Sequence, residues 1–205
     1  HKTLGLPKEN IKVYIDATYG KILGALSTLK QISQAYKGDI NVIFYYAGHG
    51  VPNEKNNEAY LLPADATPSM LEACLPLSSL YSSIGSIDAK QVIVFMDACF
   101  SGSRRENGMI VSARGVAIKP KKDIVTGNVV VFSAADGSET AYPYKEKGHG
   151  LFTYFLLKKL KESRGNVTLG DLADYIKTNV SQKSIVVNNK SQTPTISSSA
   201  QMQDV

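Results

Sequence analysis

Gln91–Gly102, QVIVFMDACFSG, is the stretch of sequence that decides the fold. Its first half is almost wholly β-branched or apolar, which is typical of a strand buried on both faces of a sheet. The apolar run stops at Asp97, and small, turn-prone residues surround Cys99 just beyond it. Open α/β sheets bind their ligands at the carboxyl ends of their strands, so the sequence predicts that Cys99 lies in or beside a ligand site.

A second stretch has the same form. Ile40–Tyr46 is an apolar strand candidate, and Gly48, His49 and Gly50 follow it closely. Two buried strands that end in a histidine and a cysteine can bring an imidazole beside a thiol. That pairing is the minimum for a cysteine nucleophile.

The remaining chain supplies alternating strand and helix candidates. Such alternation predicts an α/β domain with a mainly parallel sheet covered by helices on both faces. The other strand candidates are Ile11–Ile15, Asn128–Phe132 and Thr193–Ile196, and the helix candidates follow Thr18, span Leu77–Ile84, begin at Gly150 and follow Thr168.

Length and charge narrow the function classes. A chain of 205 residues suits one domain, and its net charge of +5 is spread over loops. No basic run is interleaved with aromatic residues, no apolar run approaches the ~18 residues of a membrane span, and no signal peptide is evident. We therefore expect no nucleic-acid or membrane partner, whereas the oligomeric state and the compartment stay open. Because the chain opens in a polar segment, we also expect residues upstream of His1 that this sequence lacks.

Two cysteines are too few for a disulfide framework. Cys74 lies in a mixed segment and is interpreted as a small buried hydrophobic residue. A Cys74–Cys99 disulfide is possible, but it would consume the candidate nucleophile. A free thiol is compatible with the cytoplasm.

Three motifs carry a resemblance to a known family. YYAGHG, ending at Gly50, resembles the histidine motif of the caspase and metacaspase superfamily, and DACFSG, around Cys99, resembles its cysteine motif in the metacaspase form. The two residues are about fifty positions apart, as in caspases. HGLFTYFLLKKL resembles the helix after the specificity loop of bacterial members, and the whole resemblance runs from about Leu4 to Ile196.

The resemblance implies a caspase-like three-layer αβα sandwich with a mainly parallel sheet of about five to six strands. It implies a single peptidase domain over residues 1–205. Within it, residues 1–103 would form a large-subunit-like part, 104–127 a basic linker and 128–205 a small-subunit-like part.

The resemblance also implies the catalytic roles. Cys99 would attack a peptide carbonyl as a thiolate, and His49 would accept its proton and return it to the leaving amine. The backbone N–H groups of Gly50 and Cys99 would form the oxyanion hole. The implied activity is that of a cysteine endopeptidase acting on peptide or protein substrates.

Substrate specificity is predicted from the residues around these motifs. In metacaspases the equivalent of Asp97 lines the primary specificity pocket, where a carboxylate favours Lys or Arg before the scissile bond. This chain has Ala47 where metacaspases often have Ser, and the family's other pocket acid would lie upstream of His1. Ser138 and Glu139 match the loop that lines the substrate cleft, and that loop lacks the Arg with which caspases bind acidic substrates.

Each of these residues has a plainer interpretation. Asp97 could cap a turn by accepting backbone N–H bonds. Glu139 could be a surface residue, and Cys99 could be an inert core cysteine. His149 lies in a second Gly-His-Gly triplet, which follows a charged loop rather than a buried strand, so we interpret it as structural.

The long basic loop after Cys99 lies where family members are often cut into two subunits. An enzyme that prefers Lys or Arg would find targets at Arg105, Arg114 and Lys122. The loop is therefore predicted to be a self-cleavage segment, although it could be only a solvated, disordered one.

We predict no cofactor, no metal site and no calcium requirement. Calcium is bound by six to eight oxygen ligands, several of them carboxylates, whereas the acidic residues of this chain are spread along the sequence. The candidates are Asp65, Glu72, Asp88 and Glu106.

Two other function classes are weighed against the peptidase. A catalytically silent caspase-like module could serve as a partner-binding or signalling domain, although the loss of Cys or His that usually marks one is absent here. A nucleotide-binding α/β domain would need a Gly-rich phosphate loop after a strand, and neither Gly-His-Gly nor Gly-Ser-Arg has that spacing.

Overall fold

The computed structural model describes residues 1–53, 55–100, 103–106, 109–112 and 125–200, with only the backbone described for residues 103–106 and 109–112. It is built from helices α1 (Tyr19–Ala35), α2 (Leu77–Gly85), α3 (Leu151–Ser163) and α4 (Leu169–Asn188), and from strands β1 (Asn41–Ala47), β2 (His49–Asn53), β3 (Glu58–Leu62), β4 (Leu75–Pro76), β5 (Gln91–Asp97), β6 (Ser103–Glu106), β7 (Met109–Ser112), β8 (Val129–Ser133), β9 (Pro143–Tyr144), β10 (His149–Gly150) and β11 (Thr195–Ser198). Short 3₁₀ turns lie at Lys8–Asn10, Leu71–Ala73 and Lys145–Lys147.

The central sheet has the strand order β1-β5-β8-β11. β1 and β8 both run parallel to β5, and β11 closes the other side antiparallel to β8. The smaller sheets are β2-β3-β4, β9-β10 and the β6-β7 hairpin. The mainly parallel α/β architecture predicted from the alternating pattern is therefore confirmed.

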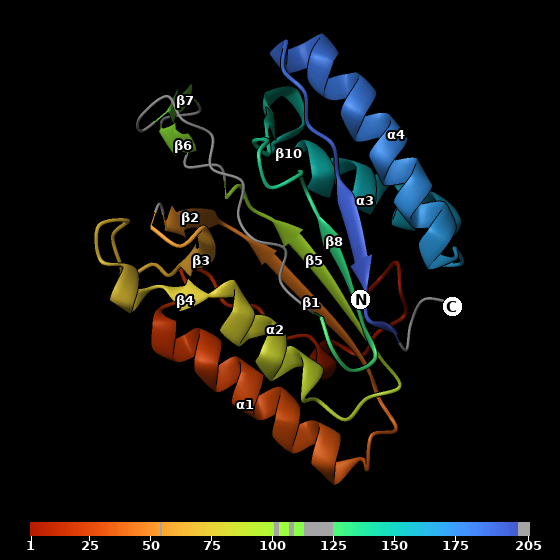
Figure 1. Cartoon of the computed structure of the whole chain (residues 1–205). Coiled ribbons are helices and arrows are strands. Elements are labelled where there is room, and N and C mark those ends of the chain that lie inside the picture. Colours follow the sequence, from red (N-terminus) through yellow and green to blue (C-terminus); the bar gives the residue numbers. More distant parts are fainter. Residues whose placement is uncertain (54, 101–102, 107–108, 113–124, 201–205) are drawn as a thin grey trace.

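Helices cover both faces of this sheet, α1 and α2 on one and α3 and α4 on the other (Figure 1). Alternate residues of β5 explain why. Val92, Val94 and Met96 pack into the core with α1 and α2, whereas Phe95 packs into the core with α3 and α4. Since successive side chains of a strand point to opposite faces, an uninterrupted apolar run serves both cores, and the predicted three layers are confirmed.

Two helices, α1 and α4, begin directly after Thr18 and Thr168, as predicted. Thr18 accepts a hydrogen bond from the backbone N–H of Lys21 at the start of α1, at 3.3 Å. Thr168 does the same for Asp171 at the start of α4, at 3.0 Å. Each side-chain oxygen satisfies one of the backbone donors that a helix leaves unpaired at its first turn.

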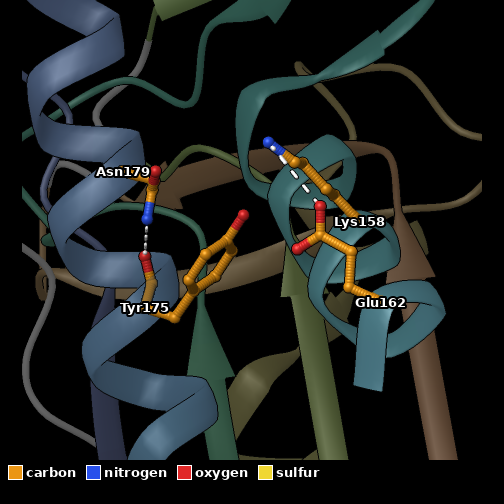
Figure 2. A network of polar contacts seen from close by, with 4 residues as sticks. All are labelled: Lys158, Glu162, Tyr175 and Asn179. Atoms are coloured by element: carbon orange, nitrogen blue, oxygen red, sulfur yellow. Dashed lines mark hydrogen bonds and ion pairs between the residues drawn. The ribbon is translucent and has the colours of Figure 1, made fainter. Parts of the chain in front are cut away.

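α3 and α4 pack on each other around an aromatic ring. Tyr175 of α4 lies between the helices near the Lys158–Glu162 ion pair of α3 (Figure 2). The Asn179 side-chain amide donates a hydrogen bond to the Tyr175 carbonyl oxygen at 2.8 Å. The Tyr175 ring meets Phe155 edge-on, with the ring centres 6.3 Å apart. The two helices therefore form one layer.

The predicted strand at Ile11–Ile15 is wrong. This segment is outside every described sheet, and the side chains of Val13 and Ile15 are about three-quarters exposed. A strand forms only where a neighbour supplies hydrogen bonds, and no described strand lies beside this segment. The central sheet accordingly has four strands in the described chain, rather than about five to six.

Candidate active site

The site is built where two parallel strands end together. β1 pairs with β5 in a register that sets Ala47 opposite Asp97, and the Gly48 N–H extends the pairing by donating to the Asp97 carbonyl at 3.2 Å. His49 and Cys99 therefore each lie two residues beyond the same paired position. The structure brings the two predicted catalytic residues to one end of the sheet.

A tight turn then redirects the chain into β2. The Tyr46 hydroxyl shares its one hydrogen between the carbonyl oxygens of His49, at 3.0 Å, and Leu62, at 3.3 Å. Burial raises the pKa of Tyr46, so this hydroxyl keeps its proton and remains a donor. His49 itself begins β2, which has β3 as its antiparallel partner.

Gly50 brings this turn against the cysteine segment. A Cβ atom at Gly50 would lie 2.5 Å from the Cys99 carbonyl oxygen and 2.3 Å from the Phe100 ring. Real Cβ atoms do not approach other atoms so closely, so the contact requires glycine. The two segments predicted to form the oxyanion hole therefore touch.

Cys99 is held in an aromatic pocket of the core. It is 4% exposed and packs in the same cluster as Phe95 and Tyr142. Burial raises the pKa of Tyr142, and the nearby Cys99 and Glu139 raise it further. Both cysteines of the chain are free, so the possible Cys74–Cys99 disulfide is not formed.

A pocket of about 440 Å³ lies beside His49 and Asp97, and Cys99 is not among its lining residues. Residues of both Gly-His-Gly triplets line it, Gly48 and His49 at the end of β1 and Gly148 to Gly150 just before α3. The lining consists of Tyr45, Ala47, Gly48, His49, Asp97, Gly148, His149, Gly150 and Thr153. The interpretation of His149 as merely structural was therefore incomplete, because its side of the chain forms a wall of the pocket.

Asp97 contributes a buried carboxylate to this pocket. It is 4% exposed, and its Oδ2 accepts a hydrogen bond from the Thr153 hydroxyl at 2.5 Å. A Cβ at Gly150 would lie 2.4 Å from the same oxygen. The second Gly-His-Gly triplet thus needs its last glycine because the Asp97 carboxylate occupies that space.

The predicted cleft residues Ser138 and Glu139 lie outside the pocket lining. Ser138 closes a local turn by donating through its backbone N–H and its hydroxyl to Asp136 Oδ1, at 3.1 and 3.0 Å. The Glu139 carboxylate accepts hydrogen bonds from the backbone N–H and hydroxyl of Thr193. Their assignment to substrate binding stays a prediction.

Of the three predicted self-cleavage residues, Arg105 lies in β6, and Arg114 and Lys122 fall outside the described residues. In the described part of the chain, no group of three or more His, Cys, Asp or Glu side chains is placed to hold a metal ion. Among the described helices, none has both the length and the apolarity to cross a membrane.

Sequence reasoning missed three side chains of the pocket, those of Tyr45, His149 and Thr153. Tyr45 alternates with Ala47 on one face of β1, so the strand pattern could have placed it beside Asp97. His149 and Thr153 carry no such signal, because nothing local in their segment shows that the start of α3 faces the end of β1.

Comparisons with known proteins agree with this architecture. The sequence model of the caspase domain family matches residues 2–205. The paracaspase of Dictyostelium discoideum is 28% identical over 158 residues, which are 77% of this chain and 36% of that protein, so the chain spans about a third of this relative.

Solved structures show the same fold. Caspase-1 from Spodoptera frugiperda superposes with a TM-score of 0.63 at 16% identity, covering 96% of this chain and 73% of that one. A protein from Geobacter sulfurreducens superposes with a TM-score of 0.60 at 21% identity, covering 89% and 74%. The family match over nearly the whole chain places this protein in the caspase domain family, a family of cysteine peptidases.

Proposed function

We propose that the domain is a cysteine endopeptidase that uses His49 and Cys99 and cleaves after Lys or Arg. One observation carries the proposal: the β1–β5 register brings both residues to the same end of the sheet, where His49 and the buried Asp97 carboxylate line a pocket. Family membership supports the reaction class.

The chemistry follows from these positions. The Cys99 thiolate attacks the scissile carbonyl carbon, and the backbone N–H groups of Gly50 and Cys99 stabilise the oxyanion. His49 takes the thiol proton and delivers it to the leaving amine, and water then hydrolyses the thioester with His49 as the base. The new amine and carboxylate complete the cleavage of one peptide bond.

The pocket accounts for the preference. Its volume accommodates a long side chain, and Asp97 supplies a negative charge that a Lys or Arg head group would neutralise. An aspartate side chain of the substrate would instead meet a like charge, which disfavours its binding.

The test is hydrolysis of a fluorogenic peptide library by the wild type and three variants. Cys99→Ala should abolish cleavage. Asp97→Asn should lower kcat/KM for Lys and Arg peptides by on the order of 10²-fold, because it removes the charge from a buried pair. Asp174→Asn, at an exposed acid of α4, should change nothing. Unchanged Lys/Arg preference in Asp97→Asn would refute the specificity.

The second candidate is a catalytically silent caspase-like module. The observation that favours it is the burial of Cys99, which is 4% exposed. Cleavage of any peptide by the wild type but not by Cys99→Ala would exclude it, whereas no cleavage by either would favour it.

We further propose that the basic loop is cut by the enzyme itself, at Arg105, Arg114 or Lys122. The support is their match to the proposed specificity. Intact mass spectrometry after incubation should show fragments for the wild type and a single mass for Cys99→Ala. A single uncut mass for the wild type after the same incubation would rule self-cleavage out.

A further inference from the structure

The Asp97 carboxylate is the end point of a hydrogen-bonded chain that joins two elements. The Thr153 hydroxyl, in the first turn of α3, donates to Asp97 Oδ2 at 2.5 Å. The Tyr45 hydroxyl, on β1, lies 2.8 Å from Thr153 Oγ1. Because the threonine hydroxyl has one hydrogen and gives it to the carboxylate, Tyr45 must be the donor to Thr153.

This chain runs from the pocket surface to a buried charge. Tyr45 is about half exposed, Thr153 is 7% exposed and Asp97 is 4% exposed. All three line the same pocket. Burial raises the pKa of Tyr45 and the neighbouring Asp97 raises it further, so the phenol keeps the proton that it donates.

The carboxylate has little freedom around this chain. Gly150 lies against Oδ2, since a Cβ there would lie 2.4 Å from that oxygen. The Thr153 hydroxyl that donates to Oδ2 belongs to the first turn of α3, so its position depends on that of the helix. The start of α3 also presents the positive end of its helix dipole toward this region, which favours a negative group.

We propose that Thr153 and Tyr45 are positioning residues that fix the Asp97 carboxylate for recognition of a cationic side chain. This inference rests on the proposed function and deepens it. Neither residue takes part in bond cleavage. They determine where the negative charge lies, and therefore how tightly the pocket holds a guanidinium or ammonium group.

The test is binding of two peptide amides to the Cys99→Ala protein by calorimetry. The peptides are identical except for a final Arg or Leu. Thr153→Val keeps the shape but removes the hydroxyl, and should weaken binding of the Arg peptide by on the order of 10- to 100-fold, the usual value of a hydrogen bond to a charged group. Leu-peptide binding should not change.

Three further variants test whether the hydrogen bonds of this chain cause the effect. Thr153→Ser keeps the hydroxyl and should restore binding of the Arg peptide to within a few-fold of the parent. Tyr45→Phe should weaken it by several-fold, but should add little to Thr153→Val, because the chain is already broken there. Thr178→Val, at an exposed threonine of α4, is the matched control and should change nothing.

The outcomes separate this inference from the proposed function. Parent-like binding of the Arg peptide by Thr153→Val, or full additivity with Tyr45→Phe, would overturn the positioning role. If Cys99→Ala binds the Arg peptide no more tightly than the Leu peptide, the cationic pocket and the positioning role both fail. In that case cleavage of other peptides by the wild type would still support His49 and Cys99 as the catalytic pair.

Discussion

The two cysteines are both buried, but their surroundings differ. Cys74 is 2% exposed and donates its thiol hydrogen to the Met70 carbonyl at 3.4 Å. Burial raises the pKa of Cys74, and the nearby Glu72 raises it further. Cys99 instead lies beside the turn that carries His49.

We predict that iodoacetamide labels Cys99 in preference to Cys74 at pH 7.5. The thiolate is the reactive species, and a raised pKa keeps Cys74 protonated until the pH exceeds the usual range for a thiol. Peptide mass spectrometry of samples labelled between pH 7 and 10 measures both rates, with Cys74→Ala as the control. Equal rates for both cysteines at pH 7.5 would contradict the assignment of Cys99 as the nucleophile.

Gly50 offers a second prediction at the residue scale. Gly50→Ala should lower kcat/KM by on the order of 10²-fold, because the new methyl group would displace the turn from the Cys99 carbonyl and disturb the oxyanion donors.

The matched control is Gly24→Ala in α1, where an added methyl group meets nothing within 4 Å. It should leave activity unchanged and raise the free energy of unfolding by roughly 0.5–1 kcal/mol, since alanine favours a helix interior. Wild-type activity in Gly50→Ala would remove the contact from the mechanism.

At the scale of elements, continuous apolar runs predict the strands of the central sheet. β5 and β8 are largely buried, as such runs indicate, whereas β1 was expected to be buried and instead exposes one face, with Ile43 and Tyr45 each 47% exposed. The ends of β1 and β5 could be placed together because parallel strands share an edge. The wall of the pocket formed by His149 and Thr153 could not be predicted in this way. It depends on how α3 packs across the sheet, and the sequence of a helix shows which of its faces is apolar without showing what that face meets.

The same limit explains the error at Ile11–Ile15. Its alternating pattern fits a strand. A strand forms only when a neighbouring strand supplies hydrogen bonds, and the local sequence does not show whether such a neighbour exists. The role of Gln192 was missed for a related reason. A single glutamine in a polar tail gives no local sign that its side chain is fully buried.

Gln192 joins three elements through its side chain and backbone. Its amide accepts from the Tyr142 N–H at 2.7 Å and donates to the Ala134 carbonyl at 2.8 Å, and its backbone N–H donates to Ser184 of α4 at 3.2 Å. It therefore ties the end of β8 to the segment that carries Tyr142, the neighbour of Cys99.

Gln192→Ala should lower the free energy of unfolding by about 3 kcal/mol, because it leaves a buried N–H and a buried carbonyl without a partner. Urea unfolding followed by circular dichroism measures this. Gln182→Ala, at an exposed glutamine of α4, should stay within about 0.5 kcal/mol of the wild type. A similarly small effect at Gln192 would show that the bonds are easily replaced.

For the whole molecule, four tyrosines titrate later in the folded state than in the unfolded one. Burial raises the pKa of each, and they are Tyr45, Tyr46, Tyr142 and Tyr175. Above about pH 10 the unfolded chain loses these protons while the folded chain keeps them. The folded state then binds more protons, so the free energy of unfolding must fall as the pH rises.

The raised pKa of Cys74 acts in the same direction from the lower pKa of a thiol. We therefore predict that stability begins to fall above about pH 8.5, where Cys74 titrates in the unfolded chain, and declines steeply above about pH 10, where the tyrosines do. Urea unfolding at intervals between pH 7 and 11 would show it. Tyr46→Phe should make the decline shallower, because one of the four titrating tyrosines is gone, although it also removes the hydroxyl bonds to His49 and Leu62. A flat profile to pH 11 would contradict the prediction.

The one-for-one pairing of β1 with β5 determines where the chain can gain or lose residues without moving His49 relative to Cys99. Residues 41 to 47 pair with residues 91 to 97 one for one. A codon added to either strand would turn its terminal side chains to the opposite face and move His49 or Cys99 along the sheet by about 3.3 Å. Codons added in the hairpin between β2 and β3 would leave that alignment intact, so the relative positions of His49 and Cys99 can be inherited unchanged while the surface around them is rebuilt.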